Sequence, residues 1–231
     1  MKRTLDTFAS FLKNPKPLKQ LKDKNLLLKD FTALYTLYVV FSILLMSILG
    51  VLLHFDLVKE YKGIDLLKEF GVLGTLLIAC IIAPLLEESL FRYHLKEMNS
   101  AIYFVFLSVG ALIVSQIDEI RQQLVIIGIA LVFAVLVIEL LKKRSRFYVT
   151  KFWMKIYPYL FYYTAIIFGL VHLSNYEDLT LGDPGFVFYI ASQTFGGLGL
   201  GYLRIKYGLV YSILFHALFN LLMVTLVILF T

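Results

Sequence analysis

Seven apolar stretches dominate this 231-residue chain and constrain its fold more than any other feature. Each is long enough, or nearly so, to cross about 30 Å of hydrocarbon as a helix rising 1.5 Å per residue. A bilayer core holds no water to satisfy free amide groups, and no ten-residue alternating pattern suits a barrel, so we predict helices. The expected fold is all-α, a polytopic transmembrane bundle of about seven spans. The stretches cover residues 31–55, 70–95, 101–117, 122–141, 157–175, 186–203 and 208–230. The third is short, and a re-entrant segment is an alternative there.

The composition agrees with a membrane protein, since 60% of residues are hydrophobic and only 16% are charged. The net charge of +6 does not indicate a nucleic-acid partner, because the basic residues alternate with apolar stretches instead of forming one patch. We therefore expect the lipid bilayer as a partner, no nucleic acid, and a multi-pass location in the cell membrane. The single cysteine, Cys80, excludes an internal disulfide.

The distribution of Lys and Arg predicts the orientation. Of 22 such residues, 18 fall in 1–30, 92–96, 142–155 and 204–206, which lie on the same side if the stretches alternate. The positive-inside rule then places the N-terminus in the cytoplasm and, with seven spans, the C-terminus outside. We expect residues 1–30 to form a cytoplasmic basic segment and residues 31–231 a single transmembrane domain. Residues 142–163 mix basic and aromatic side chains, as expected of a helix on an anionic leaflet or of a loop with an aromatic belt.

Charged residues within the second stretch are the first candidate site. A charge near the bilayer centre costs about 2.5–3.5 kcal/mol on insertion scales, so Glu87, Glu88 and Arg92 need a partner or a function. Residues four apart share a helix face, whereas neighbours point about 100° apart. Glu88 can therefore pair with Arg92, which leaves Glu87 free to face a cavity as a general base or acid. Alternatively, all three side chains extend into the head groups.

Two further polar clusters lie on later stretches. Phe168 and His172 are four residues apart, as are His216 and Asn220. Each cluster alone is also explained by packing or by hydrogen bonds between helices. Together with Glu87, however, they supply a base, a metal site or proton shuttle, and donors for an oxyanion, which suits hydrolysis of an amide.

The three clusters read EExxxR, FxxxH and HxxxN, and in this order they resemble the CPBP family of intramembrane proteases, named for CAAX proteases and bacteriocin-processing enzymes. The resemblance covers about residues 70–225 and implies a protease-like core there. It implies that Glu87 and His172 activate the attacking water, that His216 and Asn220 stabilise the oxyanion, and that Arg92 holds Glu88. We interpret Phe168 as packing that positions His172.

The chain departs from the family pattern in two places. Tyr93 follows Arg92 where relatives often have glycine, which puts a bulkier group beside the site. Residues 93–171 hold two apolar stretches where many relatives have a shorter connection, and we expect these as a peripheral insertion.

The depth of the motifs is a check on their convergence. Glu87 lies about 13 Å from a boundary at Lys96, but His172 lies about 25 Å deep if its span begins after Lys155. We expect Tyr157 to Tyr163 to lie in the interface, which removes the conflict.

Two further residues border the expected site. Pro84 should kink the second stretch or free a carbonyl there. Gln193, one turn before Gly197, lines the same cavity or bonds another helix.

The expected function is an intramembrane endopeptidase that hydrolyses a peptide bond in a membrane-associated peptide or protein through glutamate- and histidine-activated water. Two histidines and a glutamate could also hold zinc with an open position for water, as in a metalloprotease, although HExxH is absent and the cofactor stays open. The alternative is a non-catalytic membrane scaffold or a bacteriocin-immunity or regulatory protein of the same family. A proton-coupled transporter is a weaker third alternative, since no internal repeat is visible.

Overall fold

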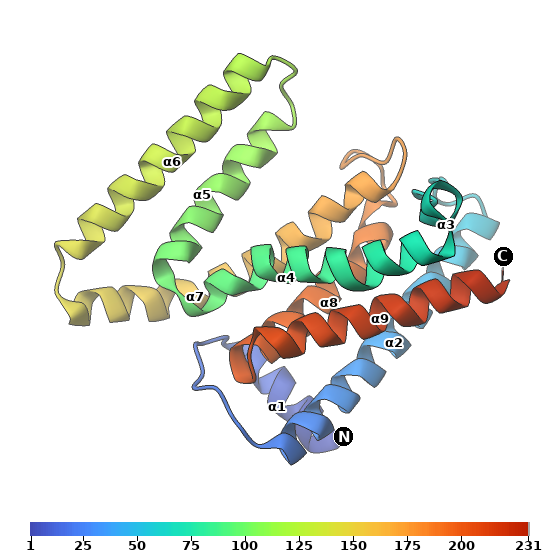
Figure 1. Cartoon of the computed structure of the whole chain (residues 1–231), viewed down its shortest axis with the longest axis horizontal. Helices are drawn as coiled ribbons and strands as arrows, with labels where there is room; N and C mark the ends of the chain where they lie inside the picture. The colour runs from blue at the N-terminus through green and yellow to red at the C-terminus, as the bar shows by residue number, and fades with distance from the viewer. Residues whose placement is uncertain (231) are drawn as a thin grey trace.

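The structure is a computed structural model that describes residues 1–230, and within them the chain is helical, with one isolated β-bridge between Gly63 and Tyr176. Figure 1 shows the order of the helices. They are α1 (Lys2–Lys13), α2 (Lys24–His54), α3 (Leu66–Leu77), a π-helical turn (Ile78–Ile82), α4 (Ala83–Arg92), a 3₁₀ turn (Tyr93–Lys96), α5 (Met98–Val114), α6 (Ile120–Lys142), α7 (Arg146–Val171), a second 3₁₀ turn (His172–Asn175), α8 (Phe186–Lys206) and α9 (Leu209–Phe230).

The all-α prediction is confirmed, and each predicted stretch corresponds to a helical segment. Within residues 1–230, five segments are long and apolar enough to cross a membrane: Lys24–His54, Leu66–Lys96, Ile120–Lys142, Arg146–Asn175 and Leu209–Leu229. The third predicted stretch becomes the shorter apolar helix α5. The sixth becomes α8, in which Gln193 and several glycines interrupt the apolar residues. About seven spans is therefore compatible with the observed helices.

Residues 146–171 form one helix, α7, so neither alternative expected for residues 142–163 describes the segment fully. Tyr157 and Phe161 are buried in the protein core, whereas Tyr159 is 76% exposed, and the interfacial position expected for residues 157–163 stays a prediction. The belt was expected because it was needed to bring His172 level with Glu87. In the structure His172, at the end of α7, does reach Glu87 of α4, with Nε2 3.7 Å from Glu87 Oε2.

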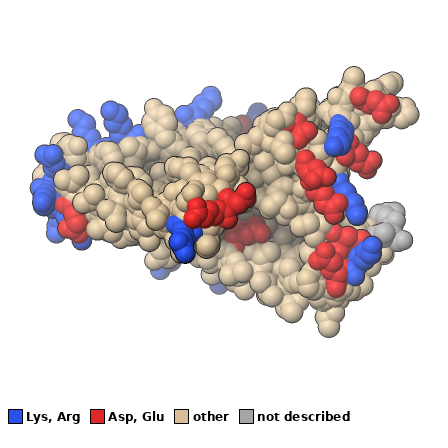
Figure 2. Space-filling view, turned by 90° about the horizontal axis from the view of Figure 1, so that it is seen from above, with Lys and Arg blue, Asp and Glu red and all other residues tan. Residues whose placement is uncertain are grey.

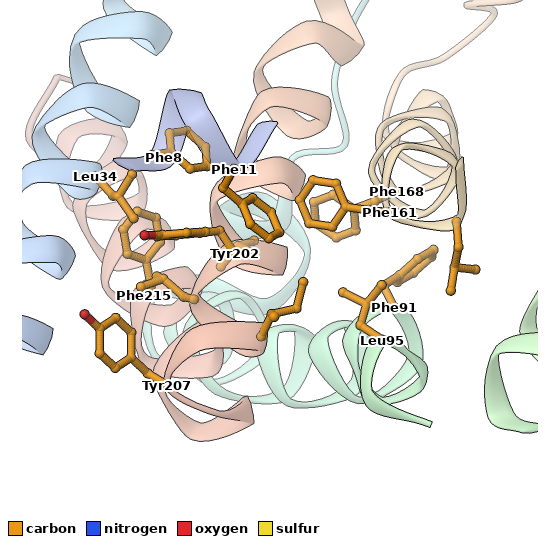
Figure 3. Close-up of a cluster of buried hydrophobic side chains, with 14 of the residues drawn as sticks. Phe8, Phe11, Leu34, Phe91, Leu95, Phe161, Phe168, Tyr202, Tyr207 and Phe215 are labelled. Atoms are coloured by element: carbon orange, nitrogen blue, oxygen red, sulfur yellow. The ribbon is translucent and has the colours of Figure 1, made fainter. Parts of the chain in front are cut away.

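Helix α1 packs onto the bundle through its aromatic face. Phe8 contacts Tyr202 of α8, with ring centroids 5.2 Å apart, and Phe11 contacts both Tyr202 and Phe161 at 5.1 and 5.2 Å (Figure 3). Asp30 of α2, only 1% exposed, joins the same elements. It accepts hydrogen bonds from Thr4 at 2.8 Å, from Lys206 at 2.5 Å and from Tyr207 at 2.6 Å. The basic N-terminal segment is thus partly a folded part of the domain.

Helices α5 and α6 form a hairpin that stands to one side of the remaining helices (Figure 1). They pack mainly on each other through Ile102, Ala134 and Ile138. One contact with the bundle is His94, whose ring stacks on Phe104 of α5 at 3.8 Å and whose Nε2 lies 2.9 Å from the Thr164 hydroxyl of α7. The two stretches expected to form a peripheral insertion are therefore this hairpin, which contacts the bundle through α5.

The basic segments meet at one end of the molecule. Lys96 donates to the Leu18 carbonyl at 2.7 Å, Arg204 donates to the Arg92 carbonyl at 3.1 Å, and Leu21 N–H donates to the Lys206 carbonyl at 2.8 Å. Figure 2 shows most Lys and Arg at this end and most Asp and Glu toward the opposite end. This separation supports the orientation predicted from the sequence.

Candidate active site

The segment that carries Glu87 and Glu88 is irregular for identifiable reasons. Gly71 in α3 has φ 65° and ψ −179°, a conformation that glycine accepts readily and that kinks the helix. The π-helical turn Ile78–Ile82 follows, and Pro84 stands at the start of α4. In π-helical register the Ala79 carbonyl would bond the N–H of residue 84, but proline has none. Asn220 of α9 donates to this carbonyl instead, at 2.7 Å. Pro84 thus frees a carbonyl, one of the two expected effects.

Glu88 and Arg92 form the predicted ion pair, with Arg92 Nε 3.4 Å from Glu88 Oε2 and both side chains 0% exposed. The guanidinium lies over the Phe168 ring, 3.9 Å from its centroid, which is cation–π contact. Glu88 also faces His216 Nδ1 at 3.1 Å. The carboxylate is therefore held by two partners, Arg92 from its own helix and His216 from α9.

Glu87 points away from this pair toward two imidazoles. Its Oε2 lies 3.7 Å from His172 Nε2 and 3.8 Å from His216 Nε2. Oε2 is buried and has no hydrogen-bond partner among residues 1–230. The residues come from the end of α7, from α9 and from α4, so three helices converge on one carboxylate oxygen.

Each histidine makes a second contact through Nδ1, on the side of the ring away from Glu87. This contact determines which ring nitrogen carries the proton and which one faces Glu87 as an acceptor. His172 Nδ1 lies 2.6 Å from the Phe168 carbonyl, which can only accept, so Nδ1 donates and Nε2 keeps its lone pair. By the same argument His216 donates from Nδ1 to the Glu88 carboxylate. Two imidazole lone pairs and a carboxylate oxygen thus face a common point, an arrangement that calls for a hydrogen-bond donor or a cation.

The structure brings together Glu87, Glu88, Arg92, His172 and His216. Asn220 joins through its contact with Ala79 in the π-helical turn, and no contact links it directly to Glu87 or either imidazole among the described residues. Phe168 packs on His172 at 4.7 Å and on His216 at 5.9 Å, so it positions both rings.

Two supporting residues escaped the sequence analysis. Ser212, fully buried on α9, lies four residues before His216, and this spacing could have identified it. Tyr38 of α2 contacts Phe219, with ring centroids 4.2 Å apart. Its helix precedes the motifs, and no spacing rule points to it.

A zinc ion fits the chemistry of these donors, since imidazole nitrogen and carboxylate oxygen are common zinc ligands. Among residues 1–230, however, no group of three or more His, Cys, Asp or Glu is arranged to hold a metal ion. The geometry therefore does not fit a metal centre as it stands, and we derive no step through a metal.

The comparisons with known proteins agree with the motifs. The family model described as type II CAAX prenyl endopeptidase Rce1-like matches residues 69–222, which is more than half of the chain and close to the expected core of 70–225. No curated protein and no solved structure matches the chain at a significant level. The chain belongs to the Rce1-like type II CAAX prenyl endopeptidase family, a membrane-embedded protease family within the CPBP group.

Proposed function

We propose that this protein hydrolyses a peptide bond of a membrane-associated peptide or protein by attack of a water molecule held at Glu87. The observation that carries the proposal is the convergence of Glu87 Oε2 with two imidazole nitrogens at 3.7 and 3.8 Å. At these separations one water can lie about 2.8 Å from the carboxylate oxygen and from an imidazole nitrogen together. A water has two hydrogens to donate to three converging acceptors.

In the first step Glu87 acts as general base, with His172 orienting the water. The water oxygen attacks the scissile carbonyl carbon, one of its protons passes to Glu87, and the carbonyl π-bond becomes the oxyanion. Glu87 then delivers the proton to the leaving amine as the carbon–nitrogen bond breaks. The Phe168 carbonyl keeps the His172 ring in place through Nδ1.

The oxyanion needs donors, which we assign to His216 and Asn220. When His216 Nε2 is protonated it becomes a donor, and the Glu88 carboxylate 3.1 Å from Nδ1 compensates the charge of the imidazolium. Asn220 Nδ2 carries two hydrogens, and only one is needed for the Ala79 carbonyl. The second is free for the substrate. Arg92 keeps Glu88 ionised and in place.

The cleaved bond lies within the bilayer on the basic side of the protein. Glu87 is nine residues from Lys96, or about 13 Å along a helix. Since the basic end is the predicted cytoplasmic end, substrates enter from the cytoplasmic half of the cell membrane. Water must reach this depth, and the irregular backbone around Pro84 adjoins the site.

The test is cleavage of a library of membrane peptides by the purified protein in liposomes. Glu87→Gln keeps the size of the side chain and removes the base, so we expect a loss of at least about 100-fold, within the range for general-base catalysis. Glu139→Gln on the exposed face of α6 is the matched control and should cleave normally. Cleavage by Glu87→Gln at the wild-type rate would exclude Glu87 as the general base, whereas absence of cleavage by both proteins would favour a scaffold.

A chelator separates the water mechanism from a metal-dependent one. If the protein residues activate the water without a metal ion, cleavage should persist after chelation. If chelation abolishes cleavage and zinc restores it, the hydrolase stands but the metal-free mechanism is wrong.

A further inference from the structure

Gln193 of α8 carries a polar atom that the mechanism above does not use. Seven buried side-chain atoms lack a hydrogen-bond partner among residues 1–230, and five of them belong to Glu87, Glu88 and Arg92. The other two are His94 Nδ1 and Gln193 Oε1. Gln193 is thus the one residue of α8 with an unpaired buried acceptor. The side chain as a whole is half-buried, although Oε1 itself is buried.

The neighbours of α8 fix the direction of this side chain. Gln193 lies one turn before Gly196 and Gly197, and therefore on the face between theirs. A Cβ at Gly196 would meet the Tyr38 hydroxyl of α2, and a Cβ at Gly197 would meet Ala165 of α7. Leu200, two turns beyond Gln193 on the same face, is 2% exposed. Gln193 therefore faces the interior between α2 and α7, where α4 and α9 lie.

Gln193 also lies at the depth of the site. A Cβ at Gly169 of α7 would meet the Thr194 side chain and the Ile190 carbonyl, which brackets Gln193 along the axis of α8. The residue next to Gly169 is Phe168, whose ring contacts Arg92, His172 and His216. The unpaired amide oxygen of Gln193 thus lies at about the same depth along the helix bundle as Glu87.

We infer that Gln193 binds the backbone of the substrate, with Oε1 accepting a hydrogen bond from a peptide N–H close to the scissile bond. This inference rests on the proposed function. A peptide extended for cleavage has backbone donors that the hydrocarbon cannot satisfy, so the protein must supply acceptors. An acceptor left unpaired in the free protein gains its partner only when the substrate arrives. Gln193 is a substrate-positioning residue.

The variant Gln193→Met removes both polar ends and keeps the length of the side chain. Losing one neutral hydrogen bond to the substrate should raise KM about tenfold, with kcat within about twofold of wild type. The midpoint of thermal unfolding should stay or rise, because a buried unpaired acceptor has been removed. Ser192→Ala is the control on the same turn. It loses the 3.0 Å contact with Ser42, so it should lower the midpoint and leave KM unchanged.

Ester substitution in the substrate gives a readout that a structural role would not affect. Each backbone N–H near the cleaved bond is replaced in turn by an ester oxygen, in a peptide that the wild type cleaves. The wild type should lose affinity at one position, and Gln193→Met should show no loss there.

The inference is wrong if Gln193→Met lowers the midpoint with KM unchanged, or if both proteins respond equally to every ester. Such results leave the proposed function intact as long as Glu87→Gln remains inactive. Absence of cleavage by the wild type would instead overturn the proposed function and this inference together.

Discussion

At the scale of single residues, the Asn220 amide has a structural task that a family motif does not reveal. It satisfies the Ala79 carbonyl at 2.7 Å, which Pro84 leaves without a helical donor. Replacing Asn220 with Leu should leave that carbonyl unpaired and lower the free energy of unfolding by about 1–3 kcal/mol. In a Pro84→Ala background the backbone regains its N–H, so the same replacement should cost less.

The measurement is a double-mutant cycle of unfolding in mixed micelles, with variants Asn220→Leu, Pro84→Ala and the pair. Additive losses would contradict the link between proline and amide. The cycle reads stability alone and so does not depend on the proposed role of Asn220 with the oxyanion.

The Glu88–Arg92 pair should matter far more than its counterpart on the surface. Arg92→Leu leaves a 0% exposed carboxylate without its cation, and removing one partner of a buried pair costs about 3–5 kcal/mol. Lys142→Leu breaks an exposed pair with Glu139 on α6, where both side chains are more than half exposed and water screens the charges, so the expected loss is much smaller. Equal losses in the two variants, measured by the same unfolding assay, would contradict this account.

The spacing of residues along one helix made much of the candidate site predictable. The i,i+4 rule separated Glu88, paired with Arg92, from Glu87, which faces elsewhere. It could not show that Asn220 reaches Ala79, or that Tyr38 packs against the helix that carries His216, because both contacts join distant helices. Those contacts depend on how the helices cross.

At the scale of elements, hydropathy located the helices, but caps and packing determined their ends. Helix α2 begins at Lys24 and not near residue 31, because Asp23 accepts from the N–H groups of Asn25 at 2.9 Å and Leu26 at 3.0 Å. Hydropathy also failed to locate α1, because its basic residues lower the mean hydropathy although Phe8 and Phe11 are buried in the core. The interfacial position expected at Tyr157 stays a prediction, and the Tyr157 hydroxyl donates to the Leu95 carbonyl at 2.8 Å, beside the expected boundary at Lys96.

The two loops at the acidic end form an element of their own, held by Asp183. This carboxylate accepts from the Tyr61 hydroxyl and from Thr180, and both bonds lower the pKa of Asp183 below its usual 3.8. The bond to Asp183 raises the pKa of Tyr61 to about 12. The contact is therefore complete at neutral pH. Its stabilisation is lost as the pH falls below 3.8 through the lowered pKa of Asp183, or rises toward the raised pKa of Tyr61.

Asp183→Asn should consequently loosen both loops at neutral pH. Amide hydrogen exchange of residues 57–65 and 176–185 should become faster, while the helices keep their protection. Asp178→Asn is the control, because its φ of 60° suits asparagine as well as aspartate. Unchanged exchange in Asp183→Asn would mean that backbone pairing, such as Ile64 N–H to the Asn175 carbonyl at 2.9 Å, holds the loops alone.

At the scale of the whole molecule, the separation of charge should fix the orientation in the membrane. Basic segments at residues 1–30, 92–96 and 204–206 meet at one end of the molecule, and Figure 2 shows most Asp and Glu toward the opposite end. A basic end favours the cytoplasmic side of the bilayer, so this distribution of charge favours one of the two possible orientations. With this orientation we expect the candidate site to open toward cytoplasmic substrates and the acidic loops to face the other compartment.

Single cysteines test this orientation in a Cys80→Ser background, since Cys80 is the sole cysteine of the chain. The variant Gly182→Cys, in the acidic loop, should react with a membrane-impermeant maleimide added to intact cells. The variant Lys143→Cys, in the basic connection between α6 and α7, should react only after the membrane is opened. The reverse pattern would place the basic end outside. The site would then be open to substrates from the other side, and the cytoplasmic entry proposed above would be wrong even if Glu87 proves to be the catalytic base.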